Sequence, residues 1–180
     1  MPSEPIEAAA TRAYRALEHL IVTLQLAPDS TATEGALIER VGLGRTPVRE
    51  AIQRLAWEGL LDVRPRSGIV IAPLIPDDLL RVIDARRGVE VVLARSAARF
   101  ITQDAADLFD SAATAMQKAV VAGNVLAFLK ADRSVDEALA HEADNPFAAR
   151  LAAPLQTHSR RFWYRYKAET GLSESAEHHV

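Results

Sequence analysis

The sequence contains no cysteine and no long hydrophobic stretch, and both absences narrow the classes of protein to which it can belong. Without cysteine there is no disulfide framework and no thiolate metal site. No apolar run approaches the roughly 20 residues that cross a bilayer. Residues 1–10 are acidic and lack the apolar core of a signal peptide. We therefore expect a cytoplasmic protein that does not span a membrane.

An excess of positive charge is also missing. The 180 residues contain 21 Lys and Arg against 24 Asp and Glu, a formal net charge of −3 at pH 7. A chain with this balance does not adhere to nucleic acid indiscriminately. Residues 44–66 differ, because five arginines and three acidic residues give that segment a charge of +2. Such a weak patch predicts binding that depends on geometry and on two copies acting together.

Residues 43–60 contain the most informative motif, which reads as a loop followed by a helix with marked ends. Thr46 is suited to cap the helix N-terminus, and Pro47 suits the first helical position, where its missing N–H would be unpaired anyway. Gly59 can adopt the left-handed conformation that ends a helix. Apolar side chains recur at helical spacing and predict one buried face: Val48, Ile52 and Leu55.

A second face of the same helix is polar. Arg45, Thr46, Arg49 and Gln53 gather near its N-terminal end. Guanidinium forks match the edge of guanine, and the amide of glutamine matches adenine. These side chains suit a helix that contacts DNA, whereas a plain amphipathic surface helix would leave the arginines solvated.

The preceding segments read as two further helices. The first is expected over about residues 8–26 and the second, a short one, over 33–41. Thr31 and Glu34 are spaced as a capping box for the short helix. Residues 42–44 form a tight connection of the kind that joins two crossing helices.

The segment after the motif reads as a basic hairpin. Residues 61–64 and 68–72 alternate like strands, and the tip between them carries cations on both sides. Together the elements describe a winged helix-turn-helix, whose recognition helix enters the major groove of DNA. Arg66 and the turn at Gly68 are then expected to contact the DNA backbone.

Residues 14–73 resemble the DNA-binding domain of GntR-type bacterial transcription regulators. Two positions depart from that family, since Gly44 stands where serine is usual and Ile38 where alanine is usual. The resemblance implies that residues 1–74 form a DNA-binding domain. One weakly basic module buries little surface, so we expect a homodimer that reads an inverted repeat in double-stranded DNA. The resemblance rests on Arg45, Thr46, Pro47, Val48, Arg49, Glu50, Ala51, Leu55, Glu58, Gly59, Leu60 and Gly68.

From Asp77 onward the sequence reads as helix, with breaks near Thr102, Gly123 and Pro146 and a further segment starting near Leu172. No strand pattern appears in this part, which predicts an all-α bundle. The expected fold is therefore mostly α, with an N-terminal winged helix-turn-helix followed by an all-α helical bundle.

This second part also resembles a known domain, the FCD effector domain of the FadR-like branch of the same family. In that family a helical bundle binds a small carboxylate, often beside a metal held by one aspartate and three histidines. The resemblance implies that residues 75–180 bind an effector and dimerise. It rests on Arg86, Val89, Glu90, Ala97, Ala98, Asp132, Asn145 and Pro146.

Charged residues interrupt the apolar stripes of this bundle. Asp132 and Asp136 fall within the stripe of one helix, Arg86 within another, and His158 within a third. Buried charges need partners, because an unpaired charge in an apolar core costs several kcal/mol. Two interpretations follow. One is an internal network of Arg86 with the carboxylates, and the other is a polar pocket for a ligand or a metal.

The pocket interpretation has a specific form. Asp132, Asp136 and His178 would surround one end of a cavity and Arg86 the other, with a small organic acid between them. The family places a histidine where this chain has Asp136, and its last histidine would lie beyond Val180, so the chain is expected to be truncated at its C-terminus. Asp132, Asp136 and His178 would still suit a divalent metal such as zinc, nickel or manganese.

The predicted function is a DNA-binding transcription regulator whose helical domain senses a small carboxylate effector. The alternative is a DNA-binding protein whose helical domain only dimerises or recruits a partner. An enzyme is not expected, because the bundle lacks the Glu-x-x-His pairs of carboxylate-bridged metal enzymes. It also lacks a recognisable nucleophile–base pair.

Overall fold

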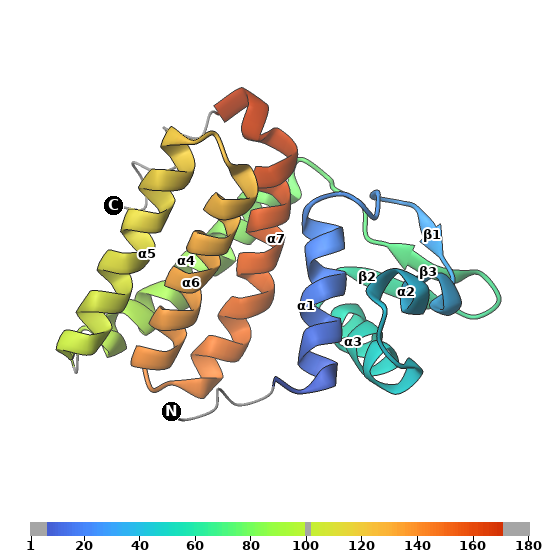
Figure 1. The fold of residues 1–180 in the computed structure, drawn as a ribbon, viewed down its shortest axis with the longest axis horizontal. Coiled ribbons are helices and arrows are strands. Elements are labelled where there is room, and N and C mark those ends of the chain that lie inside the picture. Colours follow the sequence, from blue (N-terminus) through green and yellow to red (C-terminus); the bar gives the residue numbers. More distant parts are fainter. Residues whose placement is uncertain (1–6, 100–101, 171–180) are drawn as a thin grey trace. The chain divides into compact units, whose positions relative to one another are not determined.

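The computed structural model describes residues 7–99 and 102–170. The chain divides between Pro76 and Asp77 into two compact units (Figure 1). No helix within the described ranges combines the length and the apolar character needed to cross a bilayer.

The first unit is a winged helix-turn-helix, as predicted. Its helices are α1 (Ala9–Val22), α2 (Glu34–Val41) and α3 (Arg45–Trp57), and its strands are β1 (Thr31–Ala32), β2 (Leu61–Arg64) and β3 (Gly68–Ile71). The three strands form an antiparallel sheet in the order β1-β3-β2. Strand β1 was not predicted. It contains two residues, and Thr31 pairs with Val70 far along the chain.

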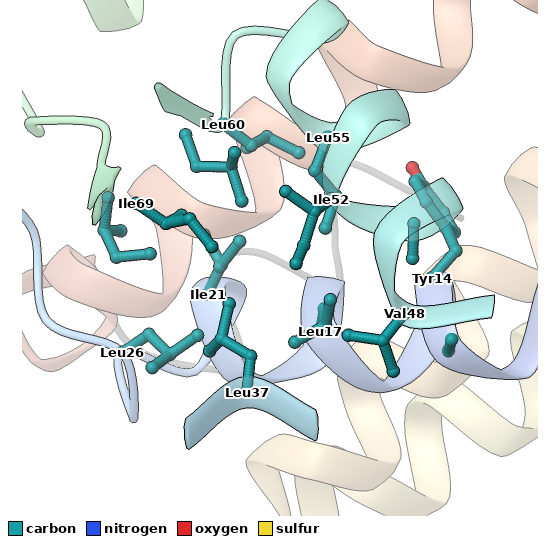
Figure 2. Packing of buried hydrophobic residues seen from close by; sticks show 14 residues of the cluster. Tyr14, Leu17, Ile21, Leu26, Leu37, Val48, Ile52, Leu55, Leu60 and Ile69 are labelled. Carbon is teal, nitrogen blue, oxygen red and sulfur yellow. The ribbon is translucent and has the colours of Figure 1, made fainter. Parts of the chain in front are cut away.

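The core of this unit lies between α1, α2, α3 and the sheet (Figure 2). Leu17 and Ile21 of α1, Leu37 of α2 and Leu55 of α3 are almost fully buried. The buried face of α3 is the one that its apolar spacing predicts. Each such side chain contributes about 1.5–3 kcal/mol on leaving water, so packing fixes how α3 is presented.

The ends of two helices differ from prediction. Helix α1 ends at Val22 instead of residue 26, because Leu24 adopts a positive φ of 57° and the chain turns back. Helix α2 is capped by Thr33, whose hydroxyl accepts from the amide of Ala36 at 3.1 Å. Thr31 cannot form the predicted capping box, because it lies in β1.

Helix α3 begins two residues earlier than predicted, at Arg45 instead of Pro47. Its N-cap is Gly44, so Thr46 lies within the first turn and is not the cap. Its C-terminal end matches the prediction, since Gly59 has a φ of +76°. The amide of Leu60 donates to the carbonyl of Leu55 at 2.9 Å, which closes the last turn.

The wing turn requires glycine at position 68. Gly68 has a φ of +87°, and a Cβ at this position would lie 2.9 Å from the carbonyl oxygen of Ala32. The third strand therefore reaches β1 only because this residue has no side chain. Gly68 shapes the wing through its backbone.

Within the described residues, the second unit contains four helices: α4 (Asp78–Ala97), α5 (Gln103–Val121), α6 (Val125–Glu142) and α7 (Pro146–Thr170). Helix α4 packs against α6 and α7, and α5 packs against α6 (Figure 1). The side chains of Thr102 and Asn124 cap α5 and α6 at the predicted breaks. The further segment expected near Leu172 lies outside the described residues.

Candidate functional site

Two sites emerge, one in each unit, and the first is the outer face of α3. Arg45, Thr46, Arg49 and Gln53 are all exposed, while the opposite face of the helix is buried in the core. The packing of α3 thus turns two guanidiniums, a hydroxyl and an amide toward solvent.

A recess between α3 and the wing brings four of the six predicted DNA-contacting residues together. Arg49, Gln53, Arg66 and Gly68 line this recess, which has a volume of about 270 Å³. Arg45 and Thr46 are not among its lining residues and lie nearer the start of α3. The recess is open, and the arginines at its border suit groups that carry hydrogen-bond acceptors, while Ile52, Val63 and Ile69 supply apolar surface within it.

An acidic residue that the sequence analysis treated only as part of a helix cap also lines this recess. The Nε atom of Arg49 donates to both carboxylate oxygens of Glu34, at 2.8 and 2.9 Å. The Nε atom of Arg45 lies 4.0 Å from the same carboxylate. The hydrogen bond and the charge of Glu34 raise the pKa of Arg49. Glu34 therefore holds a predicted DNA-contacting side chain.

Another arginine of the basic segment has a structural role. The guanidinium of Arg54 lies 3.7 Å from the ring centroid of Tyr14 and donates to Glu58 at 2.9 Å. Tyr14 donates to the other oxygen of Glu58 at 2.7 Å. This cluster ties the end of α3 to α1. The positive charge of Arg54 is therefore paired within the unit.

The second site is a buried polar cluster between α4, α6 and α7. Asp132 and Asp136 of α6 are only 6% and 7% exposed. Arg86 of α4 donates to Glu90 at 2.6 Å, to Ser159 at 3.0 Å and to Asp136 at 3.5 Å. The structure thus places Arg86 beside the carboxylates, and not across a cavity from them.

Arg160 of α7 is the residue of this cluster that the sequence analysis missed. Its Nη1 atom lies 2.5 Å from Asp136 and 3.4 Å from Asp132. Its Nη2 atom donates to Thr157 at 3.2 Å. The spacing held a usable signal, because buried residues recur every four positions along α7: Ala148, Ala152, Gln156 and Arg160. His158, which drew attention instead, is partly exposed.

Burial sets the charge state of this cluster. The pKa of Asp136 is raised to about 7, first because burial disfavours its carboxylate and then because Asp132 is close. Arg160 and Arg86 act in the opposite direction. Asp136 therefore changes charge near neutral pH.

A small cavity adjoins the cluster, lined by Arg86, Phe128, Leu129, Asp132, Ser159, Arg160 and Trp163. Its volume is about 50 Å³. Water molecules fit such a space, whereas pockets for drug-sized ligands are roughly 300–1,000 Å³. The rings of Phe128 and Trp163 stack at 4.8 Å beside it. A ligand of more than a few atoms enters only if these side chains move.

The predicted metal site does not fit the described residues. No group of three or more His, Cys, Asp or Glu side chains in residues 7–99 and 102–170 is arranged to hold an ion. Asp132 and Asp136 instead share the guanidinium of Arg160. His178, the third predicted ligand, lies outside the described residues. Within this arrangement a divalent ion would have to displace an arginine.

Comparisons with known proteins agree with this division of the chain. The family described as "Bacterial regulatory proteins, gntR family" matches residues 9–71, and the FCD domain family matches residues 81–180.

Three relatives are regulators by name. The "HTH-type transcriptional repressor RspR" of Escherichia coli strain K12 is 31% identical over 102 residues, which are 57% of this chain and 43% of that protein. An uncharacterized HTH-type regulator of Agrobacterium vitis is 29% identical over 130 residues, 71% of this chain and 76% of that protein. An uncharacterized HTH-type regulator of Streptomyces ambofaciens is 40% identical over 73 residues, which are 41% of this chain and 30% of that protein. The match thus spans less than half of the Streptomyces and Escherichia coli proteins.

Solved structures show the same fold. The structure of "E. coli McbR/YncC" has a TM-score of 0.77 and 22% sequence identity, covering 97% of this chain and 82% of that one. A GntR regulator from Rhodococcus sp. RHA1 has a TM-score of 0.60 and 16% identity, covering 94% and 89%. At these identities the likeness concerns the fold.

Proposed function

Because this chain belongs to the GntR family of bacterial transcription regulators and carries an FCD domain, we propose that it is a homodimeric DNA-binding regulator that senses a small organic acid. Its relatives are transcription regulators and not enzymes. We assign DNA binding to residues 1–74, and effector binding and dimerisation to residues 75–180.

The observation that carries the DNA-binding proposal is the recess between α3 and the wing. Arg49 and Gln53 of α3 and Arg66 of the wing line one surface. A helix in the major groove and a wing on the adjacent backbone would place these side chains on bases and phosphates, respectively. Arg45 and Thr46, exposed at the start of α3, are assigned to the same interface.

Selection from random duplexes tests this proposal. We expect the full chain to enrich a sequence with two-fold symmetry whose half-sites lie about one helical turn apart. Two chains per duplex should bind. Enrichment of no sequence, or one chain on a single half-site, would contradict the proposal.

The dimer contact is assigned to α4. Leu80, Ile83 and Val91 are 70%, 43% and 43% exposed, and their spacing places them along one side of the helix. Burial of this apolar stripe against a second copy of the chain would stabilise a dimer, whereas a monomer would leave the stripe in contact with water. Nothing comparable is needed for α4 to pack within its own unit, because Leu93 and Ala97 supply that contact.

Replacing Val91 by Glu is therefore expected to shift the full chain from dimer to monomer, because a carboxylate would be desolvated in the contact. Light scattering at tens of micromolar measures the change. Val121→Glu is the matched control, since Val121 on α5 is 90% exposed and should tolerate the same charge. Equal masses for both variants would remove α4 from the interface.

The effector proposal rests on the buried polar cluster. Arg86 and Arg160 are guanidiniums that pair readily with carboxylates, and they line the small cavity together with Ser159. The carboxylate of a small organic acid would replace an internal carboxylate as the partner of these guanidiniums. The rings of Phe128 and Trp163 would move aside to make room for it. Its binding would alter operator affinity, and linkage requires DNA to alter acid affinity by the same factor.

A panel of small mono- and dicarboxylates decides between a sensor and a domain that only dimerises or recruits a partner. We expect at least one acid to raise the melting temperature and to change operator affinity. Arg86→Met should abolish both responses while it leaves operator binding without acid unchanged. A helical domain that only dimerises or recruits a partner would respond to no acid in either assay.

The resemblance to the FCD domain also implies a metal beside the effector. The sequence-based assignment of zinc, nickel or manganese to Asp132, Asp136 and His178 requires Arg160 to leave the two carboxylates. We therefore propose that effector binding here uses guanidiniums. Elemental analysis of protein purified without chelator tests this. One metal per chain, lost in Asp132→Ala, would restore the metal assignment.

A further inference from the structure

A carboxylate in the middle of a surface proposed to meet phosphates is an unexpected feature. Glu34 is the first residue of α2 and lines the recess between α3 and the wing. Its side chain is 34% exposed, and its charge opposes that of any DNA backbone nearby. By charge alone it weakens DNA binding, so its position calls for a compensating role.

The geometry of its contact points to that role. Both oxygens of Glu34 accept from the Nε atom of Arg49, at 2.8 and 2.9 Å. The contact therefore holds the guanidinium through Nε, the nitrogen nearest the backbone. The two terminal nitrogens of Arg49 form the edge that pairs with O6 and N7 of guanine. An arginine held in this way loses less conformational freedom when it meets a base.

Helix capping does not account for Glu34. The cap of α2 is made by the hydroxyl of Thr33 with the amide of Ala36. The contribution of Glu34 to α2 itself is the modest one of an acidic residue in the first turn. Its contact with α3 spans fifteen residues of chain and joins the two helices of the turn.

We propose that Glu34 is a positioning residue that determines DNA sequence specificity. It holds Arg49 in the orientation that reads one base, and its charge repels the phosphates of any duplex. The effect is to lower affinity for all DNA while raising the preference for the operator. This inference rests on the proposed function, because it requires α3 to contact DNA.

The test compares the wild-type chain with three variants on two duplexes, the selected operator and a scrambled one, at several salt concentrations. Glu34→Gln keeps the shape of the side chain and removes its charge. Glu34→Asp keeps the charge and the first-turn acid but shortens the reach to Arg49. Glu39→Gln is the control, because Glu39 is an exposed acid of the same helix.

We expect Glu34→Gln to bind scrambled DNA more tightly and to lose about tenfold in the ratio of operator to scrambled affinity, near the low end for one bidentate base contact. Glu34→Asp should lose part of that ratio without a gain on scrambled DNA. Glu39→Gln should change both affinities by one common factor. In an Arg49→Ala background, Glu34→Gln should leave the ratio unchanged, since the residue it positions is absent.

The outcomes separate this inference from the proposed function. A wild type that discriminates between the duplexes, with Glu34→Gln showing the same ratio, overturns the positioning role and leaves a purely electrostatic one. A wild type that binds neither duplex overturns the proposed function and the inference together. Thermal unfolding of each variant identifies any loss that comes from misfolding, and Glu34→Asp then provides the decisive comparison.

Discussion

Replacing Arg160 by alanine is expected to destabilise the helical unit by about 3–5 kcal/mol at pH 8, the usual cost of breaking a buried ion pair from one side. The substitution leaves Asp132 and Asp136 buried without their shared guanidinium, and Arg86 lies 3.5 Å from Asp136. At pH 8 the site, which is almost closed to water, must then either hold two neighbouring charged carboxylates or take up a proton on one of them, and both cost stability. This is the largest effect that we expect from a single substitution.

The loss should shrink at lower pH. The pKa of Asp136 is raised to about 7 in the folded state, above the usual value near 3.9 in an unfolded chain. A folded state that binds the proton more tightly loses stability as pH rises through that interval. Arg160 lowers the pKa of Asp136, so its removal widens the interval. The destabilisation should therefore be smaller at pH 5 than at pH 8.

Urea unfolding followed by tryptophan fluorescence measures the effect. The sequence has two tryptophans, and Trp57→Phe leaves Trp163, which stacks on Phe128 beside the cluster. Arg150→Ala is the matched control, since Arg150 is an exposed arginine of the same helix, and it should change stability by about 0.5 kcal/mol or less.

The interpretation has a second check within the same cluster. In the Arg160→Ala background, Asp136→Asn should recover part of the loss, because one carboxylate then remains for Arg86. Equal stability of Arg160→Ala and Arg150→Ala at pH 8 would show that the guanidinium does not neutralise the pair.

The fold was predictable because its signals are local. The apolar spacing of Val48, Ile52 and Leu55 gave the buried face of α3, and Gly59 gave its end. Strand β1 escaped prediction because two residues carry no periodicity, and its pairing with β3 depends on a contact across almost forty residues. The capping error has the same origin, since Thr31 is committed to that pairing.

The two sites were predictable to different extents. The residues assigned to DNA lie on one helix and one hairpin, so spacing alone brought them together. Glu34 and Arg160 were missed because their partners lie on other helices, and the period of one helix does not say which residue faces it across a contact. The acidic residues Asp132 and Asp136 were correctly placed inside the bundle. Arg160, the cation that balances them, was not predicted, because His158 was the residue of α7 that the apolar pattern singled out.

Arg49→Ala is expected to lower operator affinity by about 1–3 kcal/mol per half-site, the loss of one bidentate base contact. The side chain of Arg49 is 60% exposed on the outer face of α3, so its removal should leave the fold intact. The substitution also removes the closer of the two cations beside Glu34, so its carboxylate faces the DNA with only Arg45, 4.0 Å away, to offset its charge. Both consequences act in the same direction.

The signature of this loss is its dependence on sequence, which anisotropy titrations measure with a panel of operators changed at one base pair in each half-site. For Arg49→Ala, the affinity should no longer depend on the base pair at one position of the half-site, because no side chain distinguishes its bases any longer. Arg66→Ala is the comparison. Loss of a phosphate contact from the wing should weaken binding to all duplexes alike and lower the slope of log affinity against log salt concentration by about one. If Arg49→Ala weakened every duplex by one common factor, Arg49 would be a phosphate contact. If it bound the operator as tightly as the wild type, α3 would not be the recognition helix.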